Sequence, residues 1–303
     1  MNISTSTTIP FVKAQDTVFS ATDSAQRKTL QIGQILLKMG KINRRDTEKI
    51  HRLQKKHGGL FGDAAKQLNL VSDRDVQHAL AYQFNHSTLL PKQEHTMPEL
   101  LITHQSNSAL AESMRAMRTQ LILRGFPSDQ KTLAVVGINR NSGTSLFTAN
   151  LAVLFSQLEK QTLLIDANLR NPSQHNLFNL TNKCGLSDVL ADRVAIVGAL
   201  TTVEALPNLS LLPAGTLPPN PLELLSMPKF SITNELFSDQ FDIVLYDTPG
   251  FMEGTDALMI AKHADYVLLL VHKNQSRLAD VEAVSKQITN NDIKIIGSIL
   301  VDY

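Results

Sequence analysis

The chain has 303 residues, 43 % of them hydrophobic and 19 % charged; this fits two ordinary domains and excludes wholesale disorder or a collagen-like or coiled-coil protein. No apolar run approaches the roughly 18 residues that cross a bilayer, and the N-terminal segment lacks the layout of a signal peptide. The single cysteine, Cys184, excludes an internal disulfide framework. It suits a reducing cytoplasm, where we expect the protein to lie.

The net charge of +1 hides an asymmetry between the two parts of the chain. Residues 1–130 carry 17 Lys or Arg against 11 acids, a net charge of +6, whereas residues 131–303 carry 12 against 17, a net charge of −5. Two interpretations stay open. In the first, both parts of the chain have ordinary solvated surfaces. In the second, the basic N-terminal part contacts an anionic nucleotide, a lipid or an acidic partner.

We expect a flexible tail over residues 1–26, which are rich in Ser, Thr and Ala without a sustained period. Within the next segment, residues 27–86, the chain repeats itself from Gln31 to Phe84 with an offset of 29, so that Gly33 matches Gly62 and Gln54 matches Gln83. Each copy predicts a helix, a short turn and a second helix, opened by a helix-capping residue, Asn43 or Ser72. The segment therefore predicts a small duplicated helical domain.

Residues 87–107 mix Pro, His, Ser and Gln, which predicts a linker, and a helix is expected over 108–124. The region 108–303 then forms the second domain. Beyond residue 131, short β-rich runs alternate with helical stretches, which predicts a doubly wound α/β fold with a buried parallel sheet. The predicted strands are Leu133–Gly137, Thr162–Asp166, Leu209–Pro213, Ile243–Asp247, Tyr266–His272 and Ile295–Val301.

Three strand ends carry residues suited to a phosphate ligand and its metal. A small-residue loop follows the first strand, where Gly143 and Ser145 fit the phosphate-loop pattern G-x-x-x-x-G-K-[ST], although Ile138 and Thr144 depart from it. Asp166 ends the second strand and Asp247 the fourth. A carboxylate at such a strand end holds Mg²⁺ through water or takes a proton, but each is also a common strand ending when taken alone.

These features resemble the bacterial tyrosine kinases of exopolysaccharide synthesis. The resemblance is carried by "LLIDANLRNP", "GLSDVLA", "LLPAGTLPPNPLELL" and "FDIVLYDTPG". Within that family the chain most resembles the EpsG-type branch, because the duplicated segment is similar to the N-terminal domain of secretion and pilus ATPases. The resemblance implies the fold of the deviant phosphate-loop ATPases, with ATP and Mg²⁺ as cofactors.

Carried over residue by residue, the resemblance implies a set of roles. Asp166 and Asp247 would be catalytic, and both would hold Mg²⁺, partly through water, together with Ser145. The nucleotide would be bound by Asn141, Ser142, Gly143, Thr144 and Ser145, with Arg140 as the nearest substitute cation. Glu112, Arg115 and Arg118 match the family's E-x-x-R-x-x-R motif, which implies a contact to the next subunit; a solvated helix face is the alternative.

The sequence also departs from the family. The phosphate-loop lysine is Thr144, the second acid of the D-x-D pair is Asn168, and no tyrosine cluster precedes Tyr303. A cation about 4 Å from a phosphate oxygen contributes roughly 4 kcal/mol at an effective dielectric constant near 20, so its loss costs on the order of 10³-fold in rate. We therefore expect a degenerate ATP site, which leaves open whether the chain is an enzyme.

The resemblance implies a cytoplasmic regulator of exopolysaccharide chain length, synthesis or export. It would form homo-oligomers and work with a membrane co-polymerase, which would hold it at the inner membrane; no nucleic-acid partner is expected.

The alternative is a non-catalytic adaptor whose N-terminal repeat senses cyclic di-GMP or docks a partner. The arginine that opens each cyclic di-GMP-binding copy in secretion ATPases is missing twice here, at Gln31 and Leu60. A partition- or septum-type ATPase ranks last, because Asn139 and Arg140 offer no lysine ahead of the loop.

Overall fold

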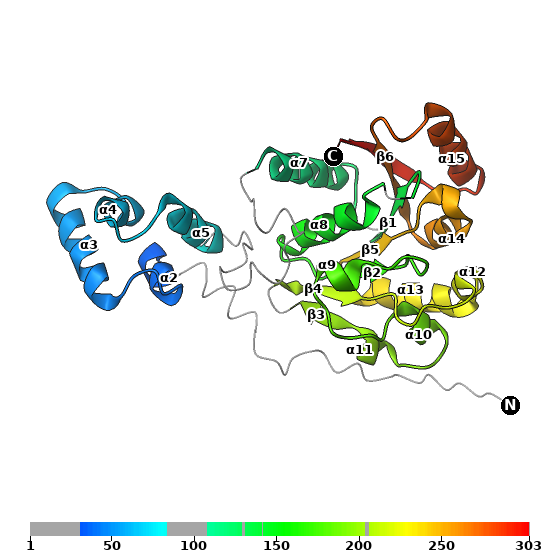
Figure 1. Ribbon diagram of the computed structural model, residues 1–303, viewed down its shortest axis with the longest axis horizontal. Coiled ribbons are helices and arrows are strands. Elements are labelled where there is room, and N and C mark those ends of the chain that lie inside the picture. Colours follow the sequence, from blue (N-terminus) through cyan, green and yellow to red (C-terminus); the bar gives the residue numbers. More distant parts are fainter. Residues whose placement is uncertain (1–30, 84–107, 129–130, 141, 204–205, 303) are drawn as a thin grey trace. The chain divides into compact units, whose positions relative to one another are not determined.

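The computed structural model describes residues 31–83, 108–128, 131–140, 142–203 and 206–302. The tail and linker expected over 1–26 and 87–107 lie outside these residues. The chain divides into two compact units, residues 1–86 and 87–303 (Figure 1). No helix of the described part is long and apolar enough to cross a membrane.

The first unit is helical in its described residues, as the repeat predicts. Its helices are α2 (Ile32–Lys38), α3 (Arg44–His57), α4 (Phe61–Gln67) and α5 (Asp73–Gln83). The two copies turn in the same way, because Gly40 and Asn69, 29 residues apart, both take the left-handed conformation after the first helix of their copy. The duplication seen in the sequence is therefore a duplication of structure.

The two predicted N-caps are confirmed. Asn43 accepts a hydrogen bond from the backbone N–H of Asp46, whose carboxylate accepts one from the N–H of Asn43, and Ser72 and Asp75 exchange the same pair of bonds. Lys41 in the first copy lies 2.8 Å from the Asp75 carboxylate in the second. Burial acts to raise the pKa of Asp75, but Lys41 and Ser72 outweigh it and lower that pKa to about 2.

The matching glycines are required by helix packing. A Cβ on Gly33 would lie 2.8 Å from the ring of Phe61, and a Cβ on Gly62 would lie 2.9 Å from Val76. Each glycine lets one helix of the bundle approach a side chain of another, around a core that includes Ile35, Leu36 and Ile50. Packing alone accounts for both glycines.

The second unit is a three-layer α/β fold. Its strands are β1 (Thr132–Gly137), β2 (Thr162–Asp166), β3 (Thr201–Val203), β4 (Leu206–Leu212), β5 (Ile243–Asp247), β6 (Tyr266–His272) and β7 (Ile295–Val301). They form one sheet in the order β3-β4-β2-β5-β1-β6-β7, parallel except for β3. The doubly wound α/β prediction is confirmed, and so are all six predicted strands, although β4 begins three residues before the predicted Leu209 and ends one residue before the predicted Pro213. The short antiparallel β3 was not predicted.

Helices cover both faces of this sheet (Figure 1). Side chains alternate along β1, so that Leu133 and Val135 face one layer and Ala134 and Val136 the other. The first layer holds α7 (Ala109–Leu123), α8 (Thr144–Ser156) and α9 (Gln174–Leu177). The second holds α10 (Leu186–Leu190), α11 (Ile196–Ala199), α12 (Pro221–Leu225), α13 (Pro228–Gln240), α14 (Asp256–His263) and α15 (Leu278–Asn290), with the 3-10 turn η2 (Phe251–Glu253).

Helix α8 lies over the centre of the sheet. All its residues except Ser145 and Leu146 are buried, which is why it has no polar face. It begins at Thr144, directly after the loop. The loop that follows β1 therefore delivers its last residues directly into the first turn of a buried helix.

Candidate functional site

The predicted site lies where three adjacent strands end. Strands β2, β5 and β1 are neighbours, and Asp166 at the end of β2 is the register partner of Asp247 at the end of β5. The loop after β1 begins beside them. The carboxyl edge of a parallel sheet is where ligands bind in doubly wound folds. The structure thus brings both predicted carboxylates and the predicted loop together.

Gln174, the first residue of α9, ties these parts to one another. Its side-chain amide donates to Asp247 Oδ2 at 2.7 Å and to the Ser145 carbonyl at 3.0 Å. The backbone N–H groups of Ser173 and Gln174 both donate to Asp166 Oδ2 at 3.0 Å. Sequence analysis did not single out Gln174, because an amide eight residues past a strand carries no motif of its own.

The two carboxyl groups are held in a setting that disfavours their joint ionisation. Burial raises the pKa of Asp166 well above its ordinary value, and the neighbouring Asp247 raises it further. Burial also raises the pKa of Asp247 to about 6, although hydrogen bonds from Gln174 and Ser145 oppose this. A pair of this kind is stable only when it keeps a proton or when a cation joins it.

Three buried oxygen atoms of this cluster have no hydrogen-bond partner among the residues that the structure describes. They are Oδ1 of Asp166, Oδ1 of Asp247 and Oε1 of Gln174. Buried polar atoms are rarely left unpaired, and each one without a partner calls for an explanation such as an ion or water. Mg²⁺ takes oxygen ligands and keeps several waters when it binds to one or two carboxylates. The residues present therefore fit hydrated Mg²⁺, with the Ser145 hydroxyl alongside.

The loop after β1 is folded tightly against the end of its own strand. Ser142 Oγ donates to the Asn139 carbonyl at 2.8 Å and lies 3.1 Å from the Thr144 hydroxyl. A Cβ on Gly137 would lie only 2.0 Å from Ser142 Oγ, so this position tolerates no side chain. Gly143 precedes α8 in the left-handed conformation, and the first-turn N–H groups of α8 have no acceptor within the helix. These N–H groups suit a phosphate.

No cationic side chain takes the lysine's place in the part of the loop that the structure describes. Thr144 is buried and its hydroxyl is turned to Ser142. Arg140 is exposed; it lies 3.3 Å from Glu253 and donates to Asn171 at 2.9 Å. Arg140 is thus held by the neighbouring loops. Asn141 lies outside the described residues.

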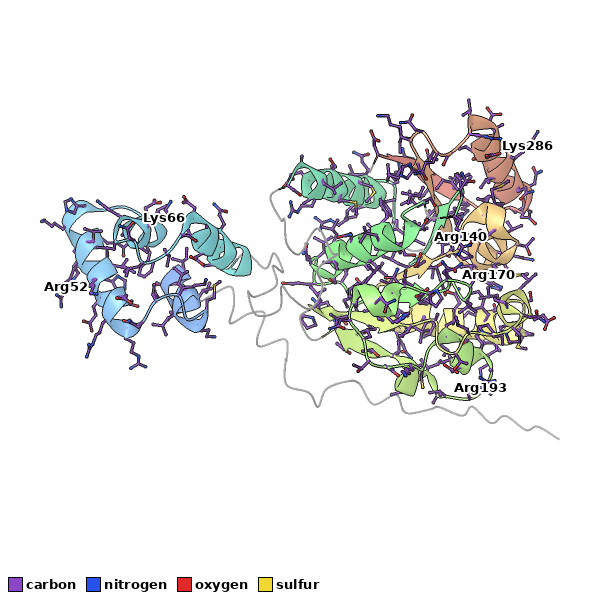
Figure 2. The ribbon with its side chains drawn as sticks, viewed as in Figure 1. Arg52, Lys66, Arg140, Arg170, Arg193 and Lys286 are labelled. Atoms are coloured by element: carbon purple, nitrogen blue, oxygen red, sulfur yellow. The ribbon has the colours of Figure 1, made fainter. Side chains whose placement is uncertain are left out.

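Arg170, which sequence analysis also missed, forms a second ionic contact at this end of the sheet (Figure 2). Its guanidinium donates to both oxygens of the buried Asp256 carboxylate, at 2.5 and 3.1 Å. The hydrogen bond to Asp256 raises the pKa of Arg170 above its ordinary value. The pair joins the loop after β2 to the start of α14.

The three charged residues predicted for an oligomer contact differ in their surroundings. Glu112 is exposed and accepts a hydrogen bond from Arg115. Arg118 is half-buried and donates to the Leu154 carbonyl on α8 at 2.8 Å, and burial lowers its pKa. Arg118 therefore fastens α7 to α8 within the chain, whereas Glu112 faces solvent.

Asn168 stands where the resemblance expects a second acid. Its side-chain oxygen accepts from the backbone N–H of Asn171 at 3.1 Å, which shapes the turn after β2. Asn168 is thus engaged in a local contact.

Comparisons with known proteins agree with this geometry. Residues 130–291, just over half the chain, match the family described as cellulose biosynthesis protein BcsQ. The chain is 30 % identical over 214 residues to the putative tyrosine-protein kinase CapB of Staphylococcus aureus, a match that covers 70 % of this chain and 92 % of CapB. The chain belongs to the bacterial tyrosine kinases, with a phosphate-loop domain of BcsQ type.

Solved structures of tyrosine kinases share the fold. The chimerical protein CapA2B2 superposes with a TM-score of 0.64 at 26 % identity, over 70 % of this chain and 97 % of that one. The kinase domain of the Escherichia coli tyrosine kinase ETK also gives a TM-score of 0.64, at 27 % identity, over 67 % of this chain and 79 % of that one. The chain spans only 28 % of full-length ETK, to which it is 28 % identical over 204 residues.

Proposed function

We propose that this bacterial tyrosine kinase relative is a cytoplasmic, EpsG-type regulator of exopolysaccharide chain length, synthesis or export. It would act at the inner membrane with a membrane co-polymerase as partner, as a homo-oligomer, and its ATP site would be degenerate. The observation that carries the proposal is a preserved pair of buried carboxylates with unpartnered oxygens, next to a loop whose lysine position holds Thr144.

The site residues have defined tasks if the nucleotide binds. The first-turn N–H groups of α8 would bind the phosphates, and the Ser145 hydroxyl with Asp166 and Asp247 would hold hydrated Mg²⁺. Bound Mg²⁺ neutralises phosphate charge. Asp166 is the candidate acceptor for the proton of an incoming tyrosine hydroxyl, since burial and the neighbouring Asp247 raise its pKa above the ordinary value and so make it a stronger base. Gln174 positions the Asp247 carboxylate for this arrangement.

The same structure argues for weak catalysis. The loop interior is filled by the Ser142 and Thr144 hydroxyls, and Arg140 is engaged by Glu253 and Asn171. A phosphate in the loop would therefore lack the charge-assisted bond that a lysine supplies, which is worth on the order of 10³-fold in rate.

Tyrosine phosphorylation and ATP turnover test the proposal on the full chain. With MgATP we expect the wild type to stay near background, Thr144→Lys to exceed it by at least tenfold, and Thr144→Lys with Asp166→Ala to return to background. A wild-type chain that turns over ATP as fast as Thr144→Lys, and that loses this activity on Asp166→Ala, would contradict a degenerate site.

The second candidate is a non-catalytic adaptor that works through its N-terminal repeat. The close packing around Gly33 and Gly62 favours it, because both glycines are explained without a ligand. Docking of a partner protein is therefore preferred to sensing of cyclic di-GMP. Heat released on titration of the full chain with cyclic di-GMP at high micromolar concentration would reverse this preference.

A further inference from the structure

The second helix of the first copy, α3, carries an unusual density of positive charge. Arg45, Lys49, Arg52 and Lys56 follow one another at intervals of four, three and four residues, which places them in one line along the helix. This line, called here the basic stripe, is exposed throughout and is flanked by exposed Arg44 and Lys55. Figure 2 shows the Arg52 side chain pointing away from the first unit.

The duplication supplies an internal control for the stripe. Residues 31–59 carry eight Lys or Arg against two acids, a net charge of +6, whereas residues 60–88 carry two against three, a net charge of −1. The positions that match Lys49, Arg52 and Lys56 in the second copy are His78, Ala81 and Asn85. The caps, the turns and the close-packed glycines are present in both copies. Arg45 is matched by Arg74. The helical framework therefore does not require Lys49, Arg52 and Lys56.

The stripe is barely neutralised within its own unit. Among the described residues, Lys49 alone of the four has an ion-pair partner, Asp46 at 3.2 Å. Glu48 is the only exposed acid on α3. Unpaired cations at this spacing repel one another, and an external polyanion would remove that repulsion.

An exposed leucine, Leu60, follows the C-terminal end of α3. Leu60 is 74 % exposed and follows Gly58 and Gly59, both of which have positive φ and open space around them. The side chain of Gln54 donates to the Gly59 carbonyl at 3.1 Å, which fixes the loop against α3. The last turn of α3 contributes Lys55, Lys56 and His57 next to this leucine in sequence.

We propose that the basic stripe and Leu60 form a docking surface for the anionic phospholipid headgroups of a membrane. Clusters of four to eight Lys or Arg on a helix are typical of such surfaces, and an exposed leucine adds apolar contact at the headgroup level. A single-stranded nucleic acid is less well suited, because α3 offers no Phe, Tyr or Trp for base stacking. The surface does not involve the nucleotide site, so its function is separate from the kinase-like one.

Sedimentation of the full chain with lipid vesicles tests this surface. Vesicles with about 30 % phosphatidylglycerol in phosphatidylcholine are compared with pure phosphatidylcholine at low salt. We expect binding only to the anionic vesicles, and loss of that binding at about 0.5 M salt, where the charges are screened within a few ångströms. Arg52→Gln with Lys56→Gln should weaken binding roughly 30-fold, since each cation near the surface contributes roughly fivefold.

The matched control removes the same charge elsewhere. Lys286→Gln with Lys294→Gln, at two exposed positions of the second unit, should change vesicle binding less than about twofold if the stripe is the site. Leu60→Ser should weaken binding a few-fold by removing an apolar contact, which salt does not screen. Unchanged thermal unfolding of every variant shows that the fold is kept.

Three results would overturn the proposal. They are equal binding to neutral vesicles, equal weakening by the two double variants, and displacement of the vesicles by a duplex DNA fragment that the chain binds more tightly at the same salt. The last result would assign the stripe to nucleic acid instead.

Discussion

Asp166 and Asp247 are register partners at the ends of neighbouring strands, and both are fully buried. Two carboxylates in contact repel each other, and burial disfavours the charged form of both. The three unpartnered oxygens around them add to this cost. Without a bound cation this cluster lowers the stability of the folded chain. We therefore regard Mg²⁺ as the cation that binds it.

The pH dependence of stability follows from the same pair. The folded-state pKa of Asp247 is raised to about 6, above the ordinary value of 3.8, so the folded chain binds the proton more tightly than the unfolded one. Its contribution to stability is therefore present below about pH 4 and is lost as pH rises through about 6. In Mg²⁺-free buffer we expect wild-type stability to fall by on the order of 2 kcal/mol over this window, measured by urea unfolding.

Asp247→Asn should remove that loss. At pH 7 without Mg²⁺ the variant should be more stable than the wild type, and added Mg²⁺ should stabilise only the wild type. Asp239→Asn, at an exposed position on α13, is the control and should behave as the wild type. An Asp247→Asn chain less stable than the wild type at pH 7 would show that the carboxylate is held ionised by contacts already present.

The sequence could predict the two carboxylates but not their supports. Asp166 and Asp247 each follow a run of apolar strand residues, and that pattern marks the carboxyl edge of the sheet. Gln174 begins the four-residue helix α9 and Arg170 lies in the loop before it. Their contacts to Asp247 and Asp256 depend on how the chain folds back, 73 and 86 residues away along the sequence. Such contacts leave no periodic signal in a single sequence.

At the scale of elements, two residues of α7 differ in their expected roles. Arg118 contacts α8 within the chain, whereas Glu112 is the candidate for a contact to a neighbouring subunit. Glu112→Gln should leave the unfolding free energy within about 0.5 kcal/mol of the wild type, because an exposed ion pair contributes little. If Glu112 contacts a neighbouring subunit, the same variant should lower the assembled mass in light scattering.

Arg118→Met supplies the contrast. It removes the bond to the Leu154 carbonyl and should lower stability by about 1 kcal/mol. An oligomer that survives Glu112→Gln and is lost only with Arg118→Met would argue that α7 affects assembly through the fold alone.

The duplicated module offers a test of helix packing. Gly33→Ala places a methyl 2.8 Å from the Phe61 ring, and we expect it to destabilise the module by about 1 kcal/mol although alanine favours helices. Phe61→Leu in the same chain should recover most of that loss, which a double-mutant cycle followed by circular dichroism would measure. Additive losses would indicate that ring and glycine do not meet.

Element prediction succeeded where local patterns are strong. The six predicted strands are runs of apolar residues bounded by turn residues, and capping residues mark the starts of two helices in the first unit. The strand β3 was missed because Thr201–Val203 is only three residues long, too short for a periodic pattern, and pairs with β4 in the antiparallel sense. Its existence depends on the strand beside it.

For the whole molecule, the division into two compact units predicts two unfolding transitions. In calorimetric scans, Gly33→Ala should lower one transition and leave the other unchanged, while Asp247→Asn should shift only the other. A single transition that both variants shift together would mean that the two units unfold as one.

The central claim is that the fold and the carboxylate site are kept while the phosphate loop has lost its cation. Titration calorimetry of MgADP into the full chain, for the wild type and Thr144→Lys, tests it most directly. We expect Thr144→Lys to bind on the order of 100-fold or more tightly than the wild type, and Asp247→Asn in the lysine chain to abolish the gain. Micromolar binding by the wild type, unimproved by the lysine, would contradict the claim.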